Sequence, residues 1–111
     1  MGETAGTETA ILFAGQGAGA LGVGLGVAES DLAARVGVGR ARAVLDVDIE
    51  AAISGGDRAA LDRTDVCQPA ILVTSLATLA ALSARGLLAD ERVGACAGLS
   101  LGEYSALTWA G

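Results

Sequence analysis

A serine between two glycines is the clearest chemical signal in the chain. Residues 98–102 read GLSLG, the G-x-S-x-G pattern that places a nucleophilic serine on a strained turn between a strand and a helix. That turn exposes the hydroxyl at the carboxyl end of the sheet, beside a helix N-terminus that favours developing negative charge. Ser100 is therefore the candidate nucleophile. The alternative is that Ser100 is an ordinary N-cap of the following helix.

The usual partner of a nucleophilic serine is missing from these residues. A serine hydroxyl is a poor nucleophile unless a neighbouring base, most often histidine, takes its proton. The 111 residues contain no histidine, and all seven basic residues are arginine. A reactive Ser100 therefore needs a base from outside them.

A second glycine pattern favours a different chemistry. Residues 17–22 read GAGALG, in which Gly17, Gly19 and Gly22 match the G-x-G-x-x-G fingerprint of dinucleotide-binding sites. In that hypothesis residues 42–46 would form a second strand ending at the acidic Asp46. Because the chain contains 17 glycines, a chance match is expected often, and the pattern alone is weak evidence.

Short apolar runs and helical segments alternate along the chain. Residues 10–15 (AILFAG) and 93–98 (VGACAG) predict buried strands that run into glycine turns. The alternation with helices predicts an α/β fold with a parallel sheet, in which the serine turn follows the second strand. No internal repeat or long linker is present.

The predicted helices differ in how clearly they are marked. The clearest runs from Pro69 to Arg85, with proline at its first position, Gly86 as its C-cap and apolar residues nearly all round. Another follows Ser100, over residues 101–111. Residues 29–45 predict a helix whose apolar stripe is Leu32, Val36, Val44 and Leu45, and single short helices are expected at 48–54, capped by Asp48, and at 57–62.

Composition excludes several classes of partner. The net charge of −6 leaves no basic surface for nucleic acid or an anionic membrane. The apolar run inside residues 66–84 carries Thr and Ser and is shorter than the roughly 18 to 20 residues of a bilayer span, which predicts a buried helix of a soluble protein. Two cysteines and no histidine are too few ligands for a zinc site, so we expect Cys67 and Cys96 to be small buried residues. Residues 1–10 lack a signal or transit pattern and are expected to be disordered or tag-like.

Three separated motifs together resemble one enzyme family. The segments LFAGQGAG (12–19), LDRTDVCQPAILVTSLATL (61–79) and CAGLSLGEYSAL (96–107) occur in the order and at about the spacing of the N-terminal motifs of malonyl-CoA:acyl-carrier-protein transacylases. These are the acyltransferases of fatty acid and polyketide synthesis. The resemblance runs from Ile11 to Gly111 and makes residues 11–111 a partial acyltransferase domain. It implies the N-terminal part of an α/β-hydrolase-like large subdomain, with a nucleophile elbow on a parallel sheet.

The resemblance assigns roles residue by residue. Ser100 is the nucleophile that takes the malonyl group from coenzyme A, and the backbone N–H groups of Gln16 and Leu101 form the oxyanion hole. Gln68 matches a glutamine that lines the active site; its alternative role is to satisfy the start of the helix at Pro69. No metal or redox cofactor is implied.

The implied reaction passes through a malonyl-serine intermediate, and the phosphopantetheine thiol of acyl carrier protein accepts the acyl group. The family's base histidine and its carboxylate-binding arginine have no counterparts here, so we expect the 111 residues alone to be inactive. An acyltransferase domain of a polyketide or fatty acid synthase is the alternative enzyme. Leu99 stands where many bacterial members have histidine and the enzymes of eukaryotic organelles often have an apolar residue. Because residues 1–10 show no transit signal, the cytoplasm and a plastid or mitochondrial matrix both stay open.

Overall fold

The computed structural model describes residues 8–15, 29, 31–46, 48–49, 51, 59, 63–89 and 92–111. Within these ranges the elements follow the order β1 (Thr9–Phe13), α2 (Leu32–Val44), α5 (Thr64–Ala84), β2 (Val93–Gly98) and α6 (Leu101–Ala110). This order confirms the predicted small α/β fold. The second strand and the helix after Ser100 begin where the sequence predicted them, whereas β1 begins one residue early, at Thr9.

The two strands pair in parallel, as predicted. Beyond an irregularity at Thr9 and Ala10, the register joins Ala10 with Ala95, Ile11 with Cys96, Leu12 with Ala97 and Phe13 with Gly98. Side chains alternate between the faces of a sheet, so these pairs divide into two sets. We call Ile11, Phe13, Cys96 and Gly98 the inner face, and Ala10, Leu12, Ala95 and Ala97 the outer face. The inner face is buried or half-buried, and every member of the outer face is exposed.

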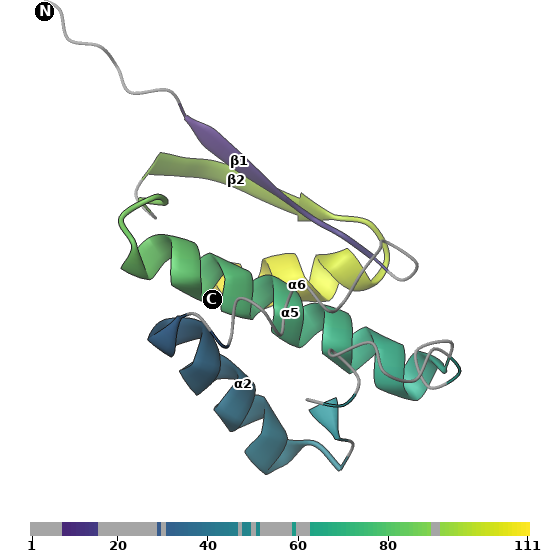
Figure 1. Cartoon of the computed structure of the whole chain (residues 1–111). Helices are drawn as coiled ribbons and strands as arrows, with labels where there is room; N and C mark the ends of the chain where they lie inside the picture. The colour runs from purple at the N-terminus through teal and green to yellow at the C-terminus, as the bar shows by residue number, and fades with distance from the viewer. Residues whose placement is uncertain are drawn as a thin grey trace, which may run out of the picture.

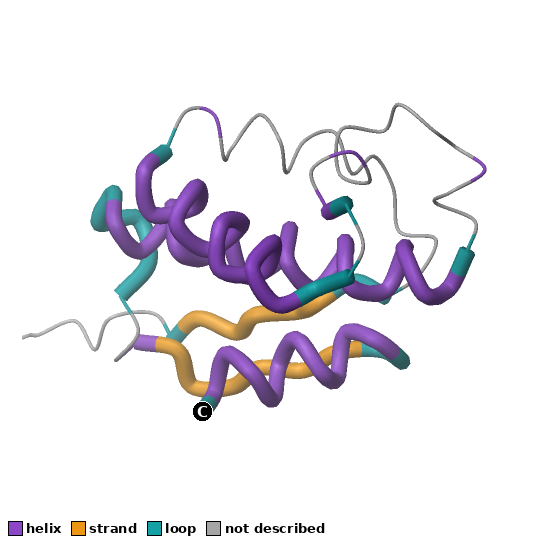
Figure 2. Tube along the Cα trace, turned by 90° about the horizontal axis from the view of Figure 1, so that it is seen from below, coloured by secondary structure: helices purple, strands orange, loops and turns teal. Residues whose placement is uncertain are grey.

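All three helices lie on the same side of the sheet (Figure 1). Helix α6 covers the inner face, and the Cys96 thiol donates a hydrogen bond to the Ala106 carbonyl, with sulfur and oxygen 3.6 Å apart. Helix α5 runs beside α6, and α2 packs on α5 farther from the sheet (Figures 1 and 2). The main core lies between α2 and α5, and it contains Ala34, Val38, Ile49, Ala70, Val73, Ala77 and Ala81.

Helix α5 begins at Thr64, so the prediction that it starts at Pro69 is wrong. Arg63 is the N-cap, and its carbonyl accepts hydrogen bonds from the N–H groups of Val66 and Cys67. Pro69 therefore lies in the second turn, where it cannot donate the N–H bond that would reach the Asp65 carbonyl. The apolar residues on both sides of Pro69 are packed in the core, and this packing stabilises the helix although one backbone hydrogen bond is missing.

The other end of α5 was predicted correctly. Gly86 has φ +71, its N–H bonds to the Ser83 carbonyl, and the Leu87 N–H bonds to the Leu82 carbonyl. This pair of bonds is a Schellman motif, in which glycine takes the left-handed position at low steric cost.

Helix α5 has 21 residues and a mean hydropathy of 1.6, so by length and composition alone it is able to cross a bilayer, and the prediction that its apolar run is too short for a span is wrong. Core helices of compact folds have the same composition, and here α5 packs between α2 and α6.

Helix α2 presents a different face from the one predicted. Leu32, Val36 and Val44 of the expected stripe are exposed, and Leu45 alone of that stripe packs on the core, partly buried like Ala41. Ala34 and Val38 are the residues buried against α5. The facing surface of α5 is rich in alanine and small, so it accommodates the small side chains of α2 at close range. Counting large apolar residues therefore selected the wrong stripe.

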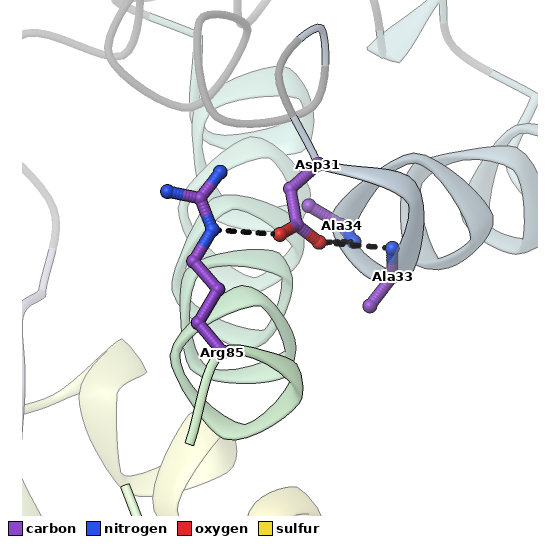
Figure 3. Close-up of polar contacts among 4 residues, drawn as sticks. All are labelled: Asp31, Ala33, Ala34 and Arg85. Carbon is purple, nitrogen blue, oxygen red and sulfur yellow. Dashed lines mark hydrogen bonds and ion pairs between the residues drawn. The ribbon is translucent and has the colours of Figure 1, made fainter. Parts of the chain in front are cut away.

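An ion pair ties the start of α2 to the end of α5 (Figure 3). Asp31 is the N-cap of α2, and one carboxylate oxygen accepts the N–H groups of Ala33 and Ala34. The other oxygen accepts a hydrogen bond from Arg85 Nε at 2.9 Å. The hydrogen bond from Arg85 and, to a smaller extent, those from the backbone hold the pKa of Asp31 below its ordinary value, against the opposing effect of desolvation.

Only parts of the two short predicted helices lie in the described residues. Asp48 Oδ1 accepts a hydrogen bond from the Ala51 N–H at 3.1 Å, which confirms the predicted cap of the first. Ala59 of the second is helical. Ile49 and Ala51 of the first are also helical, and residues 50, 52–58 and 60–62, which include Gly55 and Gly56, lie outside the described ones.

Candidate active site

The backbone at Ser100 has an unusual conformation. Its φ of 55° and ψ of −116° are close to the mirror image of an extended residue, a region that glycine enters easily and other residues do not. Among the described residues Ser100 is the one non-glycine residue with positive φ. Such a residue stores about 1–3 kcal/mol of strain and persists only when its surroundings enforce it. The sharp turn between β2 and α6 therefore has the strained backbone that a nucleophile elbow requires.

The Ser100 side chain does not act as an N-cap of α6. Ser100 stands at the N-cap position of α6, but its hydroxyl makes no capping hydrogen bond, and the residue is exposed. A capping serine also takes an extended backbone with negative φ, which Ser100 does not have. The hydroxyl is thus left free at the carboxyl end of β2.

Glycines allow the turn to close. A Cβ atom on Gly98 would overlap the carbonyl group of Gly102, and a Cβ on Gly102 would overlap the Phe13 carbonyl oxygen. A Cβ on Gly15 would lie 2.6 Å from the Leu99 carbonyl oxygen. The two outer glycines of GLSLG therefore let α6 cross both strands at backbone contact, and Gly15 lets the end of β1 approach the elbow.

The first turn of α6 leaves one donor beside Ser100. The Gly102 N–H bonds to the Leu99 carbonyl and the Glu103 N–H to the Ser100 carbonyl, both at 3.0 Å. The N–H of Leu101, the first helical residue, has no intrahelical acceptor. The Leu101 side chain is buried against Cys67 and Ile71 of α5, which fixes the position of this peptide group. Gln16, the other expected oxyanion donor, lies outside the described residues.

Gln68 is positioned by the same contact between α5 and α6. It follows Cys67, which packs on Leu101, so its turn of α5 lies beside the elbow. The side chain is half-buried and makes no hydrogen bond to another described residue. Because α5 begins at Thr64, the alternative that Gln68 satisfies the start of the helix is wrong.

The arginines at the two ends of α5 already have carboxylate partners. Arg63 pairs with Asp65 across the N-terminus of the helix, and Arg85 pairs with Asp31. The hydrogen bond and charge of Arg63 lower the pKa of Asp65, and the hydrogen bond and charge of Asp65 raise the pKa of the Arg63 guanidinium. Neither arginine is a spare cation for a substrate carboxylate.

The dinucleotide hypothesis loses one of its elements. Gly17, Gly19 and Gly22 lie outside the described residues, but residues 42–44, which that hypothesis needs in a strand before Asp46, are the last residues of α2. The acidic residue thus follows α2, the helix that packs on the side of α5 away from the sheet (Figure 1). In the described part of the chain no strand ends at Asp46, as a dinucleotide site would require.

Gly15 is the residue of this site that the sequence pattern did not single out. The signal was present in its position, directly after the first strand in AILFAG, where a glycine permits close backbone approach.

Comparison with known proteins gives one relative. No family model matches the chain, and no solved structure matches it. Over 68 residues the chain is 43% identical to the human (Homo sapiens) protein named malonyl-CoA-acyl carrier protein transacylase, mitochondrial. The match covers 61% of this chain and 17% of the human protein, so the chain spans less than a fifth of its relative's length. The chain is therefore partially homologous to a malonyl-CoA:acyl-carrier-protein transacylase.

Proposed function

We propose that this chain supplies the nucleophile of a malonyl-CoA:acyl-carrier-protein transacylase. The observation that carries the proposal is the enforced backbone of Ser100, which a purely structural serine at a helix start does not need. The partial homology to the human transacylase, over 68 residues, supports the same class of enzyme. The strained turn belongs to the N-terminal part of the acyltransferase large subdomain, within residues 11–111.

In the proposed reaction the Ser100 hydroxyl attacks the malonyl thioester carbonyl as a base takes its proton. The tetrahedral oxyanion accepts hydrogen bonds from the Leu101 and Gln16 N–H groups, and coenzyme A leaves as the thiol. The phosphopantetheine thiol of acyl carrier protein then attacks the malonyl-serine ester and regenerates Ser100. In this proposal Gln68, which is half-buried on α5, lines the acyl pocket.

As the family resemblance implies, we expect the base, and a cation for the free carboxylate of malonate, to come from polypeptide outside these 111 residues. The 111 residues contain no histidine, and Arg63 and Arg85 are engaged. We therefore expect the isolated chain to form no malonyl-enzyme at neutral pH. Rapid stoichiometric malonylation of the isolated chain at Ser100 would contradict this expectation.

A chimera tests the proposal. This chain replaces the matched segment of the human transacylase, and transfer of labelled malonyl groups to acyl carrier protein is measured. Ser100→Ala is expected to abolish transfer and the malonyl-enzyme. Ser105→Ala is the matched control, because Ser105 lies on the same helix but is fully buried. Equal activity of the two variants would refute the role of Ser100.

The same chimera tests which acyl group the enzyme transfers. Acetyl-CoA and methylmalonyl-CoA, offered beside malonyl-CoA, distinguish a malonyl enzyme from an acyltransferase domain of another synthase. The human relative is named as mitochondrial, so mitochondria are the first location to test, by imaging the protein in its own cells.

A further inference from the structure

Helix α5 carries two separate hydrophobic clusters on opposite sides. The main core, which includes Val73, lies between α5 and α2. A second cluster of described residues consists of Cys67, Ile71 and Leu101, and it shares no member with the main core. Ile71 and Val73 are two positions apart, which turns their side chains about 200° from one another around the helix axis. One side of α5 therefore packs on α2, and the other packs on the first residue of α6.

Leu101 connects the second cluster to the candidate active site. Leu99 and Ser100 are exposed, so Leu101 contributes the first buried side chain after β2, and it is 7% exposed. Its backbone N–H belongs to the peptide group that it shares with Ser100, the residue with the strained φ. A strained residue persists only while its surroundings enforce it. The contact of Leu101 with α5 therefore helps to fix both the nucleophile and the candidate oxyanion donor.

We propose, resting on the function proposed above, that Ile71 is a positioning residue for acyl transfer. Ile71 is 6% exposed, so it acts through Leu101 and not on the substrate. A β-branched side chain on a helix has one strongly preferred χ1 rotamer, so Ile71 gives Leu101 a rigid surface to pack on. That surface keeps the Leu101 N–H aimed at the developing oxyanion. Cys67 packs in the same cluster, but it precedes Gln68, so a substitution there would also disturb the proposed acyl pocket.

A smaller side chain at position 71 leaves a cavity behind Leu101. The surroundings of such a cavity relax into it in part, and here they include the first residue of α6. A displacement of 1 Å at a catalytic group costs about a hundredfold in rate, so a partial shift of the Leu101 peptide group is expected to cost about tenfold. A cavity at Val73 opens toward α2 and leaves the elbow in place.

The experiment compares two alanine substitutions in the human chimera. Val73→Ala is the matched control for Ile71→Ala, because Val73 is 8% exposed and lies on the same helix. Single-turnover malonylation of Ser100 is measured well below the thermal midpoint of each variant. We expect both substitutions to lower the midpoint, but only Ile71→Ala to lower the maximal rate, by about tenfold, with the half-saturating malonyl-CoA concentration unchanged. Equal maximal rates for the two variants would overturn the proposal.

Two further variants separate positioning from loss of folding. Ile71→Leu conserves the volume behind Leu101 and is expected to keep the malonylation rate within about twofold of the parent. A rate as low as that of Ile71→Ala would overturn the proposal. If Ile71→Ala does not fold, Ile71→Val is compared with Val73→Ala, which removes more carbon atoms. A slower Ile71→Val supports the proposal, and an equal or faster one overturns it.

The isolated chain gives a readout that does not depend on activity. We expect Ile71→Ala to shift the backbone amide resonances of Ser100 and Leu101, and Val73→Ala to leave them unchanged. Unchanged resonances with Ile71→Ala would overturn the proposal. The shift without Ser100-dependent transfer in the chimera would support the positioning of the elbow by Ile71 and refute the proposed function. Ser100-dependent transfer that the two variants affect equally would refute the positioning role alone.

Discussion

At the scale of single residues, Ser100 combines an exposed hydroxyl with a backbone conformation that its own Cβ disfavours. The backbone strain arises from the Cβ atom of Ser100, whereas the proposed acyl transfer depends on its hydroxyl. Chemistry and stability can therefore be changed separately at this position. Ser100→Ala removes the hydroxyl alone and tests the chemistry, whereas Ser100→Gly also removes the Cβ atom and tests the stability.

We predict that Ser100→Gly stabilises the isolated chain relative to Ser100→Ala by about 1 kcal/mol, after the entropic cost of glycine in the unfolded chain is subtracted from the strain relieved. Urea denaturation of the three proteins measures the difference. The expected order of stability is glycine above serine and alanine, with malonylation lost in both variants of the chimera. A less stable glycine variant would mean that the turn is not strained.

Ser105 carries the second prediction at this scale. Its Oγ is buried and has no hydrogen-bond partner among the residues that the structure describes. Removal of an unpaired buried hydroxyl eliminates a desolvation cost, so Ser105→Ala is expected to leave stability unchanged or raise it by about 1 kcal/mol. The urea midpoint checks this, and a large loss of stability would indicate a bound water at the hydroxyl.

At the scale of elements, the glycines of the chain divide into two kinds by what surrounds them. Gly37 and Gly39 lie inside α2 with nothing near the position of a Cβ, whereas Gly98 and Gly102 have backbone atoms there. The same substitution to alanine therefore has opposite consequences in the helix and at the elbow.

We predict that Gly39→Ala stabilises the protein by about 1 kcal/mol, since alanine is the better helix former and meets no atom. Gly102→Ala is expected to destabilise it by about 3 kcal/mol or more, because the backbone of β1 cannot yield to the new methyl group. Thermal unfolding of both variants gives the comparison. Tolerance of Gly102→Ala would show that α6 does not cross β1 at backbone contact.

Elements with local signals were the ones that the sequence could predict. VGACAG and the helix after Ser100 were predicted to within a residue, because glycines and apolar runs mark both ends. The start of α5 was missed because a proline inside a helix needs tertiary packing to be tolerated, and packing is not a local property. The buried face of α2 was missed for the same reason. At the site, the position of Ser100 followed from its motif, but its φ and the approach of Gly15 depend on a strand that lies far away in sequence.

At the scale of the whole molecule, the Asp31–Arg85 pair joins residues 54 positions apart, which no local pattern indicates. It closes the packing of α2 on α5 at one end, and Figure 3 shows the carboxylate bridging the guanidinium and the first N–H groups of α2. The side chain of Asp31 is largely shielded from solvent, whereas the Arg63–Asp65 pair is exposed on both sides. The two pairs should therefore differ in their effect on stability.

The pH dependence of unfolding distinguishes the two pairs. Because the pKa of Asp31 is lowered in the folded state, its ionised form contributes stability above the ordinary aspartate pKa near 3.8, and this contribution is lost as the pH falls through the lowered value. Asp31→Asn keeps a residue able to cap α2 but removes the charge. We predict that this variant is less stable than the parent chain at pH 7 and that the difference disappears when Asp31 of the parent is protonated. Asp65→Asn, the control at the exposed pair, is expected to change the urea midpoint little at either pH. A constant Asp31→Asn difference from pH 7 to acid would mean that the lost stability comes from packing or capping and not from the ion pair.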